Sequence, residues 1–375
     1  MTRLITLIFF IGSFLTAGAQ NFYLAIGTYT STGSKGIYIY NFNAQTGKAS
    51  WISNTDSCTN PSYVTFSHDG NFIYSVNETN GANPGRVSAY SFNKKKGTLG
   101  FLNTVPSGGD DPCYLAINTN DKWLAVANYT SGSLSLFPVN KNGSLKNYSQ
   151  FIQDSGTSVN KERQEKAHVH ESVFSPDHFY LMTPDLGADK VMIYHFNAMA
   201  KKPLTPATPP YIKTPPGSGP RHITFSPNGK FAYLIHELSG TLTAYSYNNG
   251  KLKQIQELPA HPAGYTGVIG SAEVQVSADG KFIYASNRGD ENTITIFSLD
   301  PANGKMKLVG YQTVFGKGPR NFIIDPTGNY LLVANQDSDN IVLFRRNKKT
   351  GLLKETDTQI KLPKPVCLQM LKRNN

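Results

Sequence analysis

Short apolar segments separated by polar turns recur along most of the chain, and one two-strand pattern occurs six times between residues 60 and 336. Each copy opens with Pro or a small residue, runs through an apolar strand, turns at Ser-Pro-Asp-Gly-Lys or a variant, and ends in a second apolar strand. The copies are NPSYVTFSHDGNFIYSVNE from Asn60, DPCYLAINTNDKWLAVANY from Asp111, HVHESVFSPDHFYLMTPDL from His168, GPRHITFSPNGKFAYLIHE from Gly219, SAEVQVSADGKFIYASNRG from Ser271 and GPRNFIIDPTGNYLLVANQ from Gly318. A repeat of about 40 to 50 residues with several strands per unit predicts the blades of a β-propeller.

A further strand and a tight turn follow most copies. Residues 87–92 alternate between apolar and polar side chains, which is typical of a half-buried strand. Asn-Gly and Thr-Gly pairs follow such strands and indicate tight hairpins. We therefore expect an all-β chain built from four-stranded blades.

The two ends of the chain together complete one more blade. Residues 22–47 match the later strands of a blade but lack its first strand, and KPVCLQML from Lys364 resembles the missing one. Joining both ends in one sheet closes the ring and removes the open edges of a linear array. The sequence thus predicts a seven-bladed propeller that occupies residues 20–375 as one domain.

Residues 1–19 have the three-part pattern of a secretory signal peptide. Arg3 precedes an apolar run from Leu4 to Leu15, and small residues follow up to Ala19. A run of about a dozen apolar residues is too short to span a membrane. We expect cleavage before Gln20 and a periplasmic or secreted mature protein with no membrane contact.

Composition adds an electrostatic preference. The formal net charge is +11 at pH 7, which favours an anionic ligand. The lysines lie scattered in hairpin turns such as 94–96 and 348–349, an arrangement that indicates solvation rather than nucleic-acid binding. The three cysteines, Cys58, Cys113 and Cys367, are an odd number and give no complete disulfide framework, although one bridge stays open. We expect a monomer.

The six copies can be aligned with one another. Two positions in this alignment differ most in side chain from copy to copy. The first set is Ser62, Cys113, His170, Arg221, Ala272 and Arg320, and the second is Glu78, Tyr129, Asp185, Glu237, Arg288 and Gln336. Adjacent antiparallel strands place the start of one beside the end of the next, so both sets should ring the same mouth of the central channel. The longest spacing between copies contains residues 153–167, and loops of that length tend to be functional.

The third to fifth copies bring a histidine, carboxylates and two arginines to this mouth, namely His170, Asp185, Arg221, Glu237 and Arg288. Arginine offers a planar fork to a carboxylate or phosphate, and histidine exchanges protons near neutral pH. An internal ion pair between Arg221 and Glu237 is the structural alternative, and position alone does not separate the two. The pair His168 and His170 has the spacing of two zinc ligands, but no third ligand is evident, so a metal site is the weaker interpretation.

At these residues the sequence resembles the seven-bladed propeller lactonase family, which includes propeller-type 6-phosphogluconolactonases and, more distantly, carboxymuconate-lactonizing enzymes. The resemblance runs from about Phe22 to Met370. Its most specific segments are Arg163-Gln164 with His168-Val169-His170, Pro184–Val191, Gly219-Pro220-Arg221-His222, and Ala272-Glu273 with Ser286-Asn287-Arg288-Gly289.

The resemblance implies hydrolysis of a sugar lactone, such as 6-phosphogluconolactone, without metal or other cofactor. It implies His170, Arg221, Glu237 and Arg288 as catalytic residues, and His168, Asp185, Glu273 and Arg320 as substrate-binding residues. His168 is the alternative claimant for the base. The expected export signal departs from a cytoplasmic sugar-phosphate enzyme and favours an unphosphorylated aldonolactone.

Two other functions stay open. A muconate-type cycloisomerase would use the same four side chains with the proton delivered to carbon. A non-catalytic propeller that binds a carbohydrate or a protein would have His170 and both arginines taken up by internal ion pairs, with no free pocket beside them. A calcium-dependent gluconolactonase is not expected, because the predicted ring is too rich in arginine for a calcium cage.

Overall fold

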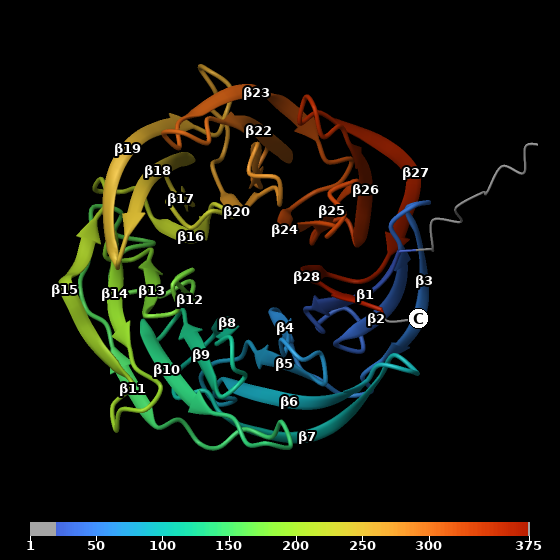
Figure 1. The fold of residues 1–375 in the computed structure, drawn as a ribbon, viewed down its shortest axis with the longest axis vertical. Coiled ribbons are helices and arrows are strands. Elements are labelled where there is room, and N and C mark those ends of the chain that lie inside the picture. Colours follow the sequence, from blue (N-terminus) through green and yellow to red (C-terminus); the bar gives the residue numbers. More distant parts are fainter. Residues whose placement is uncertain (1–19, 374–375) are drawn as a thin grey trace, which may run out of the picture.

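Seven four-stranded antiparallel sheets form a closed ring in the computed structural model, which describes residues 20–373 (Figure 1). This confirms the all-β, seven-bladed prediction. The signal peptide expected over residues 1–19 lies outside the described residues. Within the described part of the chain, no helix has the length and apolar character needed to cross a membrane.

We number the blades in chain order, beginning with the blade that both ends share. Blade 1 contains β28 (Pro365–Lys372), β1 (Asn21–Thr28), β2 (Tyr38–Asn43) and β3 (Lys48–Asn54). Blade 2 contains β4 (Val64–Phe66), β5 (Phe72–Asn77), β6 (Arg86–Asn93) and β7 (Thr98–Pro106). Blade 3 contains β8 (Pro112–Ile117), β9 (Trp123–Asn128), β10 (Ser133–Pro138) and β11 (Gln150–Gln153).

The remaining four blades follow the same order from the centre outward (Figure 1). Blade 4 contains β12 (Val173–Phe174), β13 (Tyr180–Asp185), β14 (Lys190–Phe196) and β15 (Leu204–Lys213). Blade 5 contains β16 (Pro220–Phe225), β17 (Phe231–His236), β18 (Thr241–Asn248) and β19 (Lys251–Pro259). Blade 6 contains β20 (Ser271–Val276), β21 (Phe282–Asn287), β22 (Thr293–Leu299) and β23 (Met306–Thr313). Blade 7 contains β24 (Pro319–Ile324), β25 (Tyr330–Asn335), β26 (Asn340–Arg346) and β27 (Leu353–Lys361).

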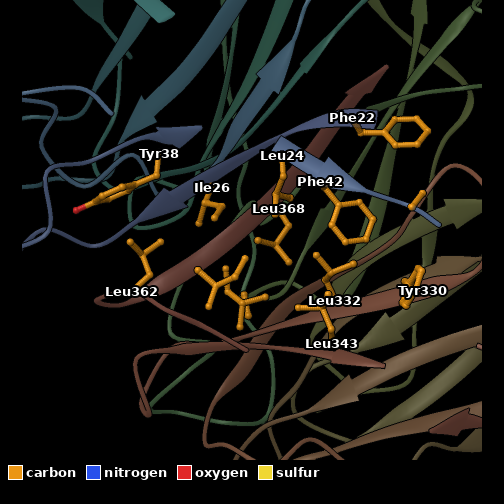
Figure 2. Packing of buried hydrophobic residues seen from close by; sticks show 14 residues of the cluster. Phe22, Leu24, Ile26, Tyr38, Phe42, Tyr330, Leu332, Leu343, Leu362 and Leu368 are labelled. Atoms are coloured by element: carbon orange, nitrogen blue, oxygen red, sulfur yellow. The ribbon is translucent and has the colours of Figure 1, made fainter. Parts of the chain in front are cut away.

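Blade 1 closes the ring by pairing the two ends of the chain. Strand β28 runs antiparallel to β1, with Leu24 opposite Met370 and Ile26 opposite Leu368. Figure 2 shows Leu24, Ile26 and Leu368 packing toward Leu332 and Leu343 of blade 7 in one apolar cluster. Because these side chains are buried, the seam between the first and last blades is held by the same hydrophobic packing as an ordinary core.

The polar turn between the first two strands of each blade explains the Ser-Pro-Asp-Gly pattern. In blade 6, Ser277 Oγ donates to Asp279 Oδ1 at 2.6 Å and accepts from the Phe282 amide at 3.1 Å. The next residue must adopt positive φ, and Gly280 does so at +67°. The aligned residues Asp121 and His178 adopt +57° and +64°, so blades 3 and 4 make the same turn without glycine.

The repeat places the two variable positions of each blade side by side, as the alignment predicts. The amide of Glu237 donates to the Gly219 carbonyl at 2.7 Å, and the amide of Glu78 donates to the Asn60 carbonyl at 3.0 Å. The start of each innermost strand and the end of the next therefore meet at one mouth of the channel.

One local expectation was wrong. The segment containing His168 and His170 is not a regular strand, because β12 covers only Val173–Phe174 and only an isolated bridge joins Val169 to Asp185. Backbone bonds do flank this bridge, from the His170 amide to the Pro184 carbonyl at 3.0 Å and from the Leu186 amide to the His168 carbonyl at 2.9 Å. The strand is interrupted because the register shifts by one residue between this bridge and the pair Val173–Met182.

Candidate active site

Glu237 lies at the centre of a cluster of arginines from three different parts of the chain. Its Oε1 accepts from Arg163 Nη2 at 2.7 Å, and its Oε2 accepts from Arg221 Nε at 2.8 Å. Arg288 Nη2 lies 3.0 Å from the same Oε2. Burial alone would raise the pKa of Glu237, but Arg288, Arg221 and Arg163 outweigh it and hold the pKa well below its usual value. Glu237 is therefore a carboxylate across the physiological pH range.

The imidazole of His170 lies beside this carboxylate, with Nε2 4.0 Å from Glu237 Oε2. Its Nδ1 lies 3.9 Å from the thiol of Cys113, and its ring meets Tyr129 edge-on. Burial, reinforced by Arg221 and other nearby cations, lowers the pKa of His170 well below its ordinary value. The ring is therefore neutral near pH 7 and keeps a lone pair with which it could accept a proton.

Arg221 is the most deeply buried arginine of the cluster, with its side chain 1% exposed. Besides Glu237, its Nη1 donates to the Ala272 carbonyl at 2.6 Å. Burial lowers its pKa to about 10, so it stays charged. These internal bonds suit Arg221 to holding Glu237 in place, whereas the side chain of Arg288 is 20% exposed and more available to a ligand.

Arg163 was absent from the residues assigned to the site in the sequence, although the Arg163-Gln164 segment and the long insertion both pointed to this loop. The loop carries Arg163 over the mouth, where Nη2 also donates to Tyr129 Oη at 3.1 Å. Its side chain is 42% exposed, the most open of the three arginines around Glu237. The repeat could not predict this position, because an inserted residue has no counterpart in the other blades.

Arg320 lies across the mouth from these groups, on blade 7. Its guanidinium stacks over the Tyr29 ring at 5.6 Å and lies 4.0 Å from Glu78. Glu78 in turn accepts from Tyr29 Oη at 2.8 Å and from the Ser62 hydroxyl. The structure thus places Arg320 at the same mouth, where its one ion pair within residues 20–373 is the long contact with Glu78.

His168 and Asp185 lie behind the cluster and face other groups. The ring of His168 stacks on Tyr129 at 4.6 Å, with Nδ1 3.1 Å from the Tyr129 carbonyl and Nε2 3.1 Å from Glu165. Both ring nitrogens are therefore occupied. Asp185 Oδ1 accepts three backbone amides, those of His168, Gly187 and Ala188. The structure does not bring the Asp185 carboxylate to Glu237.

The second oxygen of Asp185 faces Asp154 at the start of the inserted loop. Asp185 Oδ2 and Asp154 Oδ2 are both buried and accept no hydrogen bond from a donor within the described residues. Lys190 Nζ lies 2.6 Å from the other oxygen of Asp154. Burial, together with the neighbouring Asp154 carboxyl, raises the pKa of Asp185 to about 8. In its protonated form, Asp185 can donate to the Asp154 carboxylate and so link the loop to blade 4.

Glu273 also lies away from the arginine cluster, deeper in the channel. Its Oε2 is 3.4 Å from His222 Nδ1 and accepts from Asn321 Nδ2 at 2.5 Å, while Oε1 accepts the Val274 amide at 3.1 Å. Burial, with Arg221, lowers the pKa of His222 to about 4. These contacts make Glu273 part of a buried polar layer beneath the mouth.

The balance of charge at the mouth favours an anion. Four guanidinium groups, those of Arg163, Arg221, Arg288 and Arg320, face the two carboxylates of Glu78 and Glu237, which leaves a net charge of +2. The internal ion pairs expected of a purely structural cluster do form, but they do not consume the positive charge. Preorganised donors of this kind stabilise negative charge in a water-poor site.

Two further observations describe the surroundings. In residues 20–373, no three His, Cys, Asp or Glu side chains lie close enough together to hold a metal ion, and all three cysteines are free and buried. A cavity of about 470 Å³ lies outside the cluster, between blades 1 and 2. We place the chemistry at the mouth because charge and buried titratable groups gather there, not in that cavity.

Comparison with known proteins identifies the family. The model of the family described as "Lactonase, 7-bladed beta-propeller" matches residues 23–370. The chain belongs to the seven-bladed β-propeller lactonase family.

This lactonase resembles named relatives over nearly its whole length. It is 40% identical to a 6-phosphogluconolactonase of Formosa agariphila, over 89% of this chain and 95% of that protein. It is 34% identical to a 6-phosphogluconolactonase of Bacillus subtilis, over 92% of this chain and 97% of that one. Among solved structures, the periplasmic gluconolactonase PpgL of Pseudomonas aeruginosa matches with a TM-score of 0.89 and 37% identity, covering 94% of this chain and all of that one. The sequence resemblance to this family is confirmed, and the protein is a lactone hydrolase.

Proposed function

We propose that the protein hydrolyses an anionic or polyhydroxylated sugar lactone, 6-phosphogluconolactone or a related aldonolactone, at the mouth formed by His170, Glu237 and the arginines. The observation that carries this proposal is a neutral imidazole 4.0 Å from a carboxylate to which three guanidinium groups bind. The proton acceptor and the anion-binding groups of a lactonase are thus side by side.

In the proposed reaction, His170 takes a proton from water as its oxygen adds to the lactone carbonyl carbon. The carbonyl oxygen becomes negatively charged, and Arg288 stabilises it. The ring C–O bond then breaks, and the proton passes from His170 to the departing oxygen. The products are an aldonate carboxyl group and a free hydroxyl, and the base is returned to its neutral form.

The remaining groups bind and position. Arg163 and Arg320, on opposite sides of the mouth, would hold the substrate's hydroxyl or phosphate oxygens. Glu237 binds Arg163 through one carboxylate oxygen and Arg288 through the other, which fixes both guanidinium groups. Arg221 in turn fixes Glu237 through its Nε hydrogen bond. No step requires a metal ion.

We also propose that the protein works in the periplasm on an unphosphorylated aldonolactone. The leader-like residues 1–19 and the similarity to a periplasmic gluconolactonase support this localisation. If the substrate is phosphorylated instead, the net positive charge of the mouth would attract its phosphate group.

A lactone panel tests the proposal. Purified protein is assayed on 6-phosphogluconolactone and on glucono-δ-lactone, with and without EDTA, and products are followed by NMR. We expect turnover well above spontaneous hydrolysis, insensitive to the chelator, with an aldonate as product. Rates equal to the spontaneous ones on both lactones would contradict the proposal, and an isomerised product would indicate the cycloisomerase instead.

A further inference from the structure

A groove lies between the outer strands of each blade and the loop that connects it to the preceding blade. In blade 2 this groove is open, unlike in the blades compared below. One side of the groove is the third strand of the blade, on which a row of three alternate side chains points to the same face. In blade 2 this strand is β6, and the three side chains are those of Arg86, Ser88 and Tyr90. The incoming loop consists of residues 54–59. Between the row and this loop lies the cavity of about 470 Å³.

The same groove is filled in three other blades. In blade 3 a Cβ on Gly108 would lie 2.9 Å from Ser135 and 3.1 Å from Tyr148, so the loop packs directly on the row. In blade 6 the loop residue His261 fills the groove, and its carbonyl accepts from Tyr311 Oη at 3.0 Å. In blade 7 Phe315 of the loop stacks on Phe344 with ring centres 6.1 Å apart.

Among the described residues, blade 2 has no ring at this place, because its loop carries Asp56, Ser57 and Thr59 there, while Cys58 is buried in the same apolar cluster as Tyr90. The loop is also held differently. Asn77 Nδ2 donates to the Thr59 carbonyl at 2.8 Å, whereas the corresponding asparagines of blades 3, 6 and 7 donate to the carbonyl at the position of Thr55, that of Ser107, Ala260 or Val314. The opening therefore goes with small side chains on the loop and with a different path of the loop. Its volume falls within the range of small-molecule sites, roughly 300 to 1,000 Å³.

The groups left free in this cavity are those that recognise a sugar. Arg86 makes no ion pair among the described residues and only one long hydrogen bond, from Nε to Thr104 Oγ1 at 3.4 Å. Asn83 adds a side-chain amide, and Asn54, whose Nδ2 donates to the Thr55 carbonyl at 2.9 Å, adds an amide oxygen. Phe101 packs edge-on against Tyr90 at 5.7 Å but stays 62% exposed, so one aromatic face is available for stacking.

The charge of the lining selects among ligands. Arg86 is its single cation and Asp56 its single carboxylate, so the cavity is neutral where the mouth is strongly positive. An anion would favour the mouth, whereas a neutral molecule with hydroxyl groups and an apolar face matches the amides, the guanidinium and the aromatic ring.

The cavity opens on the same face of the propeller as the mouth. Asn77 and Thr79 border the cavity, and Glu78 between them turns to the mouth, where Tyr29 and Ser62 bind it. We propose that the cavity between blades 1 and 2 is a second site, which binds a neutral saccharide beside the lactonase mouth. This inference does not depend on the catalytic roles assigned above.

Binding of neutral sugars to the purified protein tests this site. The probes are D-glucose, D-galactose, maltotriose and cellotriose, measured by saturation-transfer NMR and calorimetry. Two variants alter the cavity, Phe101→Ala by removing the exposed ring and Ser57→Trp by placing a large ring on the loop that lines the cavity. Both changed positions are exposed, and unchanged lactonase activity verifies the fold.

We expect at least one probe to bind, and Phe101→Ala to weaken it by up to about tenfold, the value of a good aromatic contact. Ser57→Trp should abolish binding, and Arg288→Gln at the mouth should leave it unchanged. The proposal is overturned if no probe binds at its solubility limit. It is also overturned if binding survives Ser57→Trp but is lost in Arg288→Gln, because the sugar then occupies the mouth.

Discussion

Glu78 and Glu237 occupy the same position of the repeat, at the end of the second strand of blades 2 and 5, yet their surroundings differ. Three guanidinium groups bind Glu237 at 2.7 to 3.0 Å. Glu78 receives two hydroxyl groups, from Tyr29 and Ser62, and its nearest cation, Arg320, is 4.0 Å away. A shared fold position thus fixes where a carboxylate lies, and the neighbouring blades decide what it does.

The difference extends to the groups behind each carboxylate. Blade 4 contributes the neutral His170 and the loop bearing Arg163 to the side of Glu237, whereas blade 1 contributes Tyr29 to the side of Glu78. We therefore assign proton transfer and stabilisation of the oxyanion to the Glu237 side. In the proposed function, Arg320 on the Glu78 side would hold the opposite end of the substrate.

The largest expected effect is at the base. His170→Gln should lower kcat by about 10² to 10⁴, because glutamine cannot accept the proton of the attacking water. The matched control is His168→Gln, whose ring nitrogens already contact the Tyr129 carbonyl and Glu165 and which should retain activity within several-fold. Equal losses in both variants would remove the distinction between the two histidines.

The two glutamates give the next effect. Glu237→Gln should lower kcat/KM by about 10- to 100-fold, since it breaks charge-assisted bonds to three arginines. Glu78→Gln keeps its contacts with two hydroxyl groups and should change kcat/KM only a few-fold. Steady-state kinetics of both variants on one lactone make the comparison, and a greater loss in Glu78→Gln would reverse the assignment of the two sides.

The exposed arginine of the loop should act on binding. Arg163→Gln should raise KM by about tenfold with a smaller change in kcat, the value of one charge-assisted hydrogen bond to an anion. Lys161→Gln is the control, a neighbouring cation on the same loop that makes no ion pair within the described residues. A pure kcat loss in Arg163→Gln would show that the loop serves the chemical step rather than binding.

The pH profile should also be unusual. The pKa of His170 is lowered well below 6.5 by burial and by Arg221, so the base stays deprotonated as the pH falls through 6.5. The profile of kcat/KM for the free enzyme should therefore lack an inflection near 6.5 and fall only at distinctly lower pH. A half-maximal rate at an ordinary histidine pKa would contradict a neutral, buried base.

The smallest effect concerns the tether of the loop. The pKa of Asp185 is raised to about 8, so the stability gained from its protonated form is complete below about pH 4 and is lost as the pH rises through 8. Asp185→Asn cannot ionise and should lose less unfolding free energy between pH 5 and pH 9 than the unaltered protein. Urea titrations at the two pH values measure this, and identical losses would argue against the link through protonated Asp185.

Much of the fold could be predicted from the sequence because each blade repeats the same pattern of strands and turns. The Ser-x-Asp-Gly turn, the alternating strands and the complementary ends made the blade count and the closure through β28 and β1 predictable. The repeat failed where its register is interrupted. The residues before β12 were expected to form a strand, but their pairing with β13 shifts by one residue between Val169 and Val173.

The candidate site was predictable in the same measure. His170, Arg221, Glu237 and Arg288 lie together because aligned positions of neighbouring blades must meet at one mouth. The position of Arg163 could not be predicted from the aligned copies, because this residue belongs to an insertion. It also treated Asp185 like the other ring positions, since the proximity of Asp154 depends on where the loop folds back.

The most direct test is a crystal structure of the His170→Gln variant with 6-phosphogluconate or gluconate bound. The account predicts the ligand at the mouth, its carboxylate beside residue 170 and within hydrogen-bond distance of Arg288, with Arg163 or Arg320 on its other oxygens. A ligand bound away from these arginines, in the cavity between blades 1 and 2 or elsewhere, would contradict it.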